Sequence, residues 1–286
     1  MKKLFFTVLG ILPAHSAVLM SEDFESYDLA VDNLEAQTTG NWITDPIETP
    51  SIAVLGNASG SPVTFGSKSL VVGGLPTDGS EAELGVAYAL APTGSGFDPA
   101  NYGLETEMSF SVDLILNSGG GQSLTDDFRF SFFDLSNNPL ATLLFTNDLD
   151  GNGNVVDGFA TIIRSNMTEA GVFDTQALIP LNTVFTLNLV LSPLLNKWSG
   201  SLSQDGLDFT LFANVDLTQN QGPPVPEANV GAFGLDWLKG TGQPDWGTNY
   251  LIADNFLLQS QTPVPEPSVP LLVSAFAMTA FLRRRR

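Results

Sequence analysis

One short polar stretch, Asp148 to Asp157, has the residue types and the spacing that a ligand site requires. Side chains that carry oxygen recur along it at nearly alternate positions: Asp148, Asp150, Asn152, Asn154 and Asp157. Ca²⁺ takes about six to eight oxygen ligands, and a loop of this kind supplies several of them. The stretch is therefore a candidate calcium site, and calcium is the one cofactor that the sequence suggests.

This stretch matches an EF-hand or dockerin-type loop only in part. The first, third, fifth and sixth positions of the motif agree, and the backbone carbonyl of Asn154 fits the seventh. The twelfth position, which should carry a bidentate carboxylate, is Phe159, and Asp157 is an imperfect substitute. The flanking residues have the composition of strands. A plain polar hairpin loop between Thr146 and Val155 is the alternative interpretation.

A second possible activity is glycoside cleavage, because a pair of carboxylates can cleave a glycosidic bond. The sequence contains no cysteine, and its single histidine is His15. The rest of the chain therefore cannot form His- or Cys-ligated zinc sites, a Ser-His-Asp triad or a thiol nucleophile. Glu105 and Glu107 point to the same face of a predicted strand. Exposed glutamates are ordinary in so acidic a chain, so we expect no catalysis there. A polysaccharide-degrading hydrolase or lyase is the alternative function.

Sugar binding without catalysis is better supported by the aromatic residues. A lectin-like site needs an aromatic ring for the apolar face of a pyranose, with amides or carboxylates nearby for its hydroxyl groups. Trp246, Asp245, Asn249 and Tyr250 lie close together in a glycine-rich region, and Trp246 is flanked by loop-forming residues. We expect these four residues to form a candidate glycan site. The other tryptophans lie in or beside apolar strands and are expected in the core: Trp42, Trp198 and Trp237.

The clearest strand signal runs from Leu104 to Leu114. Its even positions carry Leu, Thr, Met, Phe, Val and Leu, whereas its odd positions carry Glu, Ser or Asp. This period of two is typical of a strand with one buried and one solvent-facing side. About a dozen such strands, separated by Gly, Asn and Pro turns and without an amphipathic helix, predict an all-β fold. We expect an antiparallel β-sandwich (jelly roll) that forms a single domain over residues 18–260.

Residues 1–17 have the pattern of a secretory signal peptide, with two lysines, an apolar run and small residues near the expected cleavage point after Ser16. Removing this segment and the C-terminal tail leaves five Lys and Arg against 30 Asp and Glu, a net charge of −25. Such a surface repels nucleic acid and anionic lipid. Divalent cations are its natural partners.

The C-terminal region, residues 261–286, joins a linker to three elements in a fixed order. These are Pro265-Glu266-Pro267, an uncharged apolar segment at 269–282 and an arginine cluster at 283–286. Prolines interrupt helices and strands, so the first element should be accessible to a protease. The apolar segment is shorter than the ~20 residues that cross a bilayer comfortably, which favours a transient inner-membrane intermediate. An ordinary C-terminal membrane anchor is the alternative.

In the order and spacing of these elements, the tail resembles the PEP-CTERM sorting signal of exported bacterial proteins. The resemblance implies that exosortase, a membrane enzyme, recognises and cleaves the tail. It also implies sorting to the cell envelope or the extracellular matrix of a Gram-negative bacterium. Because such sorting is associated with exopolysaccharide and biofilm formation, an exopolysaccharide is the expected partner. We expect a binding or structural role for the exported domain.

The two ends of the domain resemble the first and last strands of concanavalin A-like (LamG-like) jelly rolls. The residues concerned are Glu22-Asp23-Phe24-Glu25-Ser26-Tyr27, Gly40-Asn41-Trp42 and Tyr250-Leu251-Ile252-Ala253-Asp254-Asn255-Phe256. This resemblance covers residues 18–260 and implies that the first and last strands pair. Laminarinase-like enzymes of this fold use a Glu-x-Asp-x-x-Glu run. Phe110 stands where the second catalytic glutamate would be, counted from Glu105.

Overall fold

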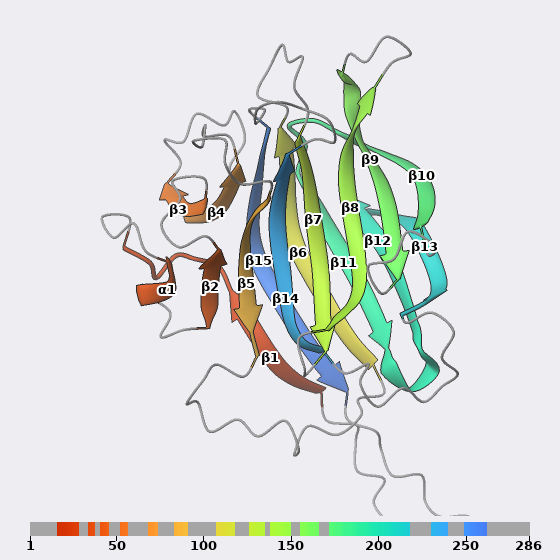
Figure 1. Cartoon of the computed structure of the whole chain (residues 1–286), viewed down its shortest axis with the longest axis horizontal. Helices are drawn as coiled ribbons and strands as arrows, with labels where there is room; N and C mark the ends of the chain where they lie inside the picture. The colour runs from red at the N-terminus through yellow and green to blue at the C-terminus, as the bar shows by residue number, and fades with distance from the viewer. Residues whose placement is uncertain are drawn as a thin grey trace, which may run out of the picture.

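Two antiparallel β-sheets packed against each other form the molecule, as the computed structural model shows (Figure 1). The structure describes residues 16–28, 34–37, 41–45, 52–56, 68–73, 83–90, 107–117, 126–134, 138–149, 155–165, 172–217, 230–239 and 249–261. Among these residues, the helices are the short α1 (Leu34–Gln37) and the 3-10 helix η3 (Pro193–Leu195). The prediction of an antiparallel all-β sandwich is confirmed.

The eight-stranded sheet, called sheet A, has the order β13-β12-β11-β6-β15-β4-β3, and β1 pairs with β15 outside this path. Its strands are β1 (Ser16–Glu22), β3 (Ile52–Gly56), β4 (Lys68–Gly73), β6 (Glu107–Asn117), β11 (Phe185–Ser192), β12 (Lys197–Gln204), β13 (Leu207–Asp216) and β15 (Tyr250–Gln261).

The seven-stranded sheet, called sheet B, has the order β10-β9-β8-β7-β14-β5-β2 and lies in front of sheet A in Figure 1. Its strands are β2 (Trp42–Asp45), β5 (Glu83–Ala89), β7 (Asp126–Asp134), β8 (Pro139–Leu149), β9 (Val155–Ser165), β10 (Val172–Pro180) and β14 (Val230–Lys239).

Alternating side chains of the two sheets fill the space between them. On β6 the even residues from Met108 to Leu114 are buried, and the odd residues between them are partly exposed. This confirms the period-two prediction for the part of the segment that the structure describes. Trp42, Trp198 and Trp237 are at most 1% exposed, so their predicted place in the core is also confirmed.

The first and last strands pair, as the resemblance to concanavalin A-like domains implies. The register of β1 and β15 runs antiparallel from Ser16 opposite Gln261 to Glu22 opposite Phe256. Directly after β1 the chain turns at Phe24, whose φ of 56° is left-handed. The ring of Phe24 then lies 5.7 Å from that of Phe256, so this turn anchors β1 in the core beside the last strand.

Ser16 and Ala17, which the sequence places at the end of the signal peptide, begin β1. Residues 1–15 and the sorting tail from Thr262 onward lie outside the described residues, and so does the whole Pro265-Glu266-Pro267 element. Within the residues that are described, none of the helices has the length and apolar character needed to cross a membrane.

Candidate functional site: the outer face of sheet B

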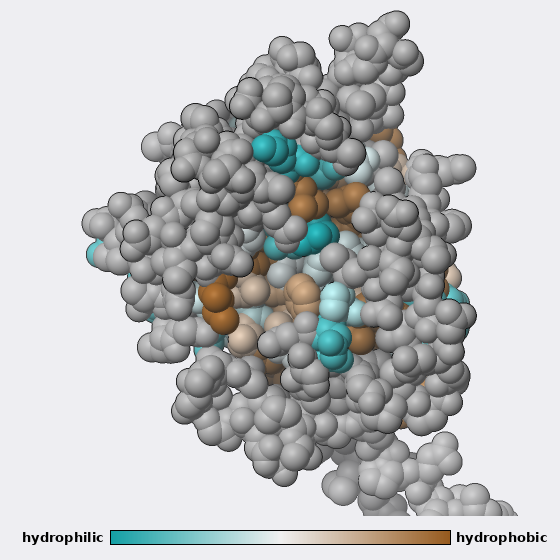
Figure 2. Space-filling model, in the orientation of Figure 1, coloured by the Kyte–Doolittle hydropathy of each residue, from teal (hydrophilic) through white to brown (hydrophobic). Residues whose placement is uncertain are grey.

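Strand β7 presents a polar and partly aromatic face to the outside of the sandwich. Phe128 and Phe130 point inward and are buried, so Arg129, Ser131 and Phe133 lie on the opposite face by the period of a strand. Figure 2 views the molecule from this side and shows a hollow in the surface where hydrophilic and hydrophobic residues meet. Ligand sites are usually concave and combine apolar surface with a few polar groups. This face is therefore the candidate site.

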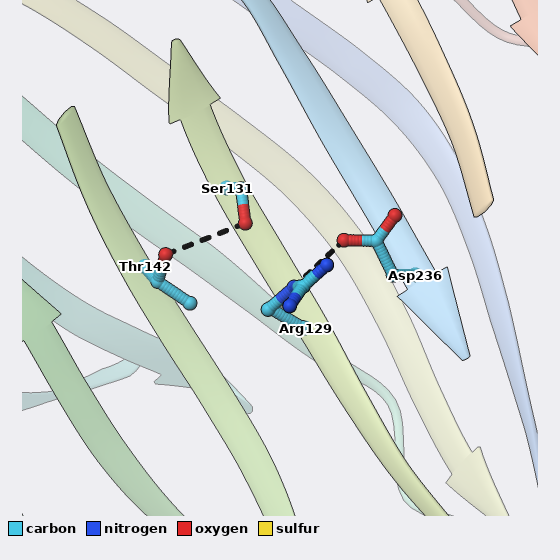
Figure 3. Close-up of polar contacts among 4 residues, drawn as sticks. All are labelled: Arg129, Ser131, Thr142 and Asp236. Atoms are coloured by element: carbon cyan, nitrogen blue, oxygen red, sulfur yellow. Dashed lines mark hydrogen bonds and ion pairs between the residues drawn. The ribbon is translucent and has the colours of Figure 1, made fainter. Parts of the chain in front are cut away.

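An ion pair links β7 to β14 on this face. Arg129 Nε donates to Asp236 Oδ2 at 2.8 Å, and the two residues are opposite each other in the register (Figure 3). Their side chains are 17% and 13% exposed. A hydrogen bond between charged groups is stronger than a neutral one, and partial burial reduces its screening by solvent. The pair holds the guanidinium and the carboxylate at fixed positions on the outer face of sheet B.

A second polar contact joins β7 to β8 next to this ion pair. The hydroxyl groups of Ser131 and Thr142 lie 3.4 Å apart, and the two residues are opposite each other in the register (Figure 3). Ser131 is 0% exposed and Thr142 is 1% exposed. Because a ligand cannot reach these hydroxyl groups, they support the site and do not contact a ligand directly.

Phe133 is the aromatic residue of the outer face. It is partly exposed, and its Cε2 atom would lie 3.2 Å from a Cβ atom placed on Gly234. The ring thus packs over the glycine on the neighbouring strand β14. Gly234 in turn is two residues from Asp236, so the ring and the ion pair share one surface. An aromatic face beside paired donors and acceptors is the arrangement that binds a pyranose.

Sequence reasoning did not identify Phe133, Arg129 or Asp236 as site residues. A signal for Phe133 was present in the doublet Phe132-Phe133, because adjacent residues of a strand point to opposite faces. Phe132 is 1% exposed and occupies the core, which leaves Phe133 on the outside.

The predicted glycan residues Asn249 and Tyr250 do not share one surface. Asn249 is 0% exposed, and its Nδ2 atom donates to the carbonyl oxygen of Asp126 at 3.0 Å, across the sandwich. Tyr250 instead packs on Val71, Ile115 and Ile252, a small apolar cluster separate from the main core. The structure therefore places Asn249 in the interior. The other two predicted residues, Trp246 and Asp245, lie outside the described residues.

The candidate calcium loop lies between two paired strands. Asp148 belongs to β8 and Asp157 to β9, and Leu149 is opposite Val155 in the register. The expectation that strands flank the loop is confirmed. Asp150, Asn152 and Asn154 lie outside the described residues. Elsewhere in the described stretches, no three His, Cys, Asp or Glu side chains gather as metal ligands.

The strand that carries the laminarinase-like run offers no second carboxylate at the critical position. Phe110 is 1% exposed, and its ring contacts those of Phe132 and Phe256 at 5.4 and 6.2 Å. This position thus faces the core and packs there. Glu107 begins β6 and is partly exposed, whereas Glu105 lies outside the described residues.

The two sheets form an antiparallel jelly-roll β-sandwich. Its fold is similar to that of the winged bean acidic lectin complexed with methyl-α-D-galactose, with a TM-score of 0.50 at 10% identity over 86% of this chain and 99% of that chain. Peanut lectin has a TM-score of 0.49 at 13% identity, over 87% of this chain and 98% of the lectin chain. The CBM2 module of the evolved Dit of Lactobacillus casei BL23 phage J-1 has a TM-score of 0.48 at 12% identity, over 88% of this chain and 99% of the module. No protein-family model and no curated protein sequence matches the chain.

Proposed function

We propose that this protein is a non-catalytic carbohydrate-binding protein that is exported to the cell envelope or extracellular matrix of a Gram-negative bacterium. The observation that carries the binding role is the joint position of Phe133 and the Arg129–Asp236 ion pair on the outer face of sheet B. The lectin-type fold supports the same role, because the winged bean lectin of this fold is complexed with a galactoside.

Each part of this site has a distinct task in sugar recognition. The Phe133 ring offers an apolar plane for the C–H face of a pyranose. Arg129 supplies N–H donors and Asp236 supplies acceptors, and together they match the donor and acceptor character of sugar hydroxyl groups. Their ion pair at 2.8 Å holds these groups in place before a ligand arrives. Preorganisation lowers the entropic cost of binding.

A non-catalytic role agrees with the chemistry available near this face. A glycosidase of the usual kind needs two carboxylates on either side of the scissile bond. Asp236 is already engaged by Arg129. Phe110, the position at which a laminarinase-like run would carry its second glutamate, packs between the sheets.

Export and sorting follow from the two ends of the chain. The segment 1–17 would direct the chain across the inner membrane, and the apolar segment 269–282 would hold it there transiently. An exosortase-type enzyme would then cut at Pro265-Glu266-Pro267. The strongly acidic domain would be released close to the exopolysaccharide that we propose as its partner.

Binding to a glycan panel tests this function directly. The wild-type protein and its Phe133→Ala variant are compared, with Phe209→Ala as a matched control. Phe209 is also an exposed aromatic residue, at 52% exposure, but it lies on β13 of sheet A. We expect Phe133→Ala to weaken binding about tenfold or more, the equivalent of one lost ring contact, while Phe209→Ala binds normally. Failure of the wild type to bind any glycan, or equal binding by both variants, would overturn the proposal.

A further inference from the structure

A row of small residues runs along β5 and β14 beside the proposed sugar site. Three register pairs form it: Ala232 with Ala89, Gly234 with Ala87, and Asp236 with Gly85. From the first pair to the last, the row covers four residue steps, or about 14 Å at the rise of an antiparallel strand. Ala87 and Ala89 are partly exposed, whereas Ala232, Gly234 and Gly85 are buried, so a glycan lying on this row meets mainly the methyl groups of Ala87 and Ala89.

Apolar side chains stand on both sides of this row. Phe133 packs over Gly234 on the side of β7. On the other side, Ile43 of β2 is opposite Ala87 and is 45% exposed. The row is thus a floor of small residues between two apolar walls. Such a shape fits a flat, extended ligand better than a compact one.

Acidic residues outnumber basic ones around the row, because Asp45 of β2 is opposite Gly85 and Glu83 of β5 is opposite Leu238 in the register. Arg129 and Asp236 neutralise each other at one end of it. The whole chain has a net charge of −20. A polyanion approaching this surface is repelled over the range of a Debye length, whereas an uncharged glycan is not.

We infer that the row binds an internal segment of an uncharged polysaccharide, lying along β5 and β14 between Phe133 and Ile43. This inference rests on the proposed carbohydrate-binding function and adds the class of ligand to it. The ligand is a neutral polysaccharide that binds through several consecutive internal sugar residues. A single terminal sugar or a uronate polymer would not be the preferred ligand. The ion pair would contact the hydroxyl groups of the ring nearest Asp236.

The test measures binding of the purified protein to a neutral galactan, a neutral glucan and polygalacturonate in the presence of a chelator. A galactose and a glucose oligosaccharide series of increasing length is titrated in parallel. Two variants narrow the row, Ala87→Leu and the smaller Ala87→Thr, and Ser109→Leu on β6 of sheet A is the matched control. Melting temperature shows whether each variant folds.

We expect one of the neutral polymers to bind and affinity to rise about tenfold from the monosaccharide to the longer oligomers. Ala87→Leu should lower polymer affinity about tenfold, Ala87→Thr by less, and Ser109→Leu not at all. Equal affinity for monosaccharide and oligomer, equal binding of polygalacturonate, or full binding by both folded Ala87 variants would overturn this inference while the proposed function stands. Binding to none of the carbohydrates would overturn both.

Discussion

The carboxylate of Asp236 rests directly on the backbone of Gly85 in the neighbouring strand. A Cβ atom on Gly85 would lie 2.3 Å from Asp236 Oδ1, a distance that real Cβ contacts essentially never show. The two residues are opposite each other in the register of β14 and β5. Absence of a side chain at position 85 is thus what allows Asp236 to reach Arg129, its partner on the other side.

Gly85→Ala should therefore break the ion pair without disrupting the sandwich. The added methyl group displaces a carboxylate at the end of a short side chain, which can rotate away. We expect a loss of about 1.5–3 kcal/mol in the free energy of unfolding, the usual range for a hydrogen bond to a charged group, together with weaker glycan binding. Urea denaturation and a binding titration measure the two effects. Ser109→Ala on β6 of sheet A lies outside the proposed site; it is the control and should retain both the ion pair and glycan binding.

The stability of the domain should fall as the pH rises from about 4 to about 7, because of Asp254. Burial raises the pKa of Asp254 from its ordinary value to about 7, and the carboxylates of Glu25, Asp23 and Asp113 act in the same direction. The backbone N–H of Asn255 opposes this shift by donating to Asp254 Oδ1 at 2.7 Å. The folded state therefore keeps its proton in a pH range where the unfolded state has lost it.

The sign of the effect follows from proton linkage. Below the unfolded pKa both states are protonated and Asp254 has no effect. Between the two pKa values the unfolding free energy decreases with pH, and above about 7 the accumulated loss reaches up to about 4 kcal/mol. Asp254→Asn removes this loss, so it should stabilise the protein at pH 8 and leave it nearly unchanged at pH 4. Asp208→Asn on the exposed part of β13 is the control. A variant less stable than wild type at pH 8 would contradict the prediction.

Calcium should raise the melting temperature if the loop between β8 and β9 binds it. A ligand that binds only the folded state stabilises it by about 2.7 kcal/mol at a hundredfold excess over Kd. Calcium and magnesium are compared at matched ionic strength, since any salt weakens the repulsion within an acidic protein. Magnesium demands a tighter octahedron than calcium, so an oxygen-rich loop of this kind should prefer calcium. If Asp148→Ala plus Asp150→Ala leaves the calcium-specific increment unchanged, the loop is only a hairpin turn.

Processing of the C-terminal tail is tested by replacing Pro265, Glu266 and Pro267 with alanine. The recognition element is then lost while the apolar segment persists, so a membrane-retained precursor should accumulate. Intact mass of the exported protein is the measurement. A wild-type exported form that still carries the arginines at 283–286 would rule out cleavage.

The fold was predictable because its signals are local. The alternation along β6 from Met108 to Leu114 can be recognised from neighbouring residues alone. The lengths of the strands and the turn residues between them then predict the all-β fold. Pairing of β1 with β15 could not be derived from periodicity, since it joins residues from opposite ends of the chain. It was predicted only because the sequences at both ends resemble those of a known fold.

The site was not predictable in the same way. Arg129 and Asp236 are separated by 107 residues, and Gly85 comes from a third segment. Which arginine meets which aspartate depends on strand order and register, and the sequence pattern gives neither. Aromatic residues in a glycine-rich loop, such as Trp246, attract attention more readily than a phenylalanine within a strand. Alternation along β7 is enough to put Phe133 on the outer face, but only strand order and register bring it beside Arg129 and Asp236.

The structure of the protein with a bound neutral oligosaccharide tests the central claim most directly. We predict a sugar ring stacked on Phe133, with hydroxyl groups within hydrogen-bonding distance of Arg129 or Asp236 and the chain continuing over Ala87. An oligosaccharide bound instead beside Tyr250 on sheet A, or at Trp246 without contact to Phe133, would contradict the account.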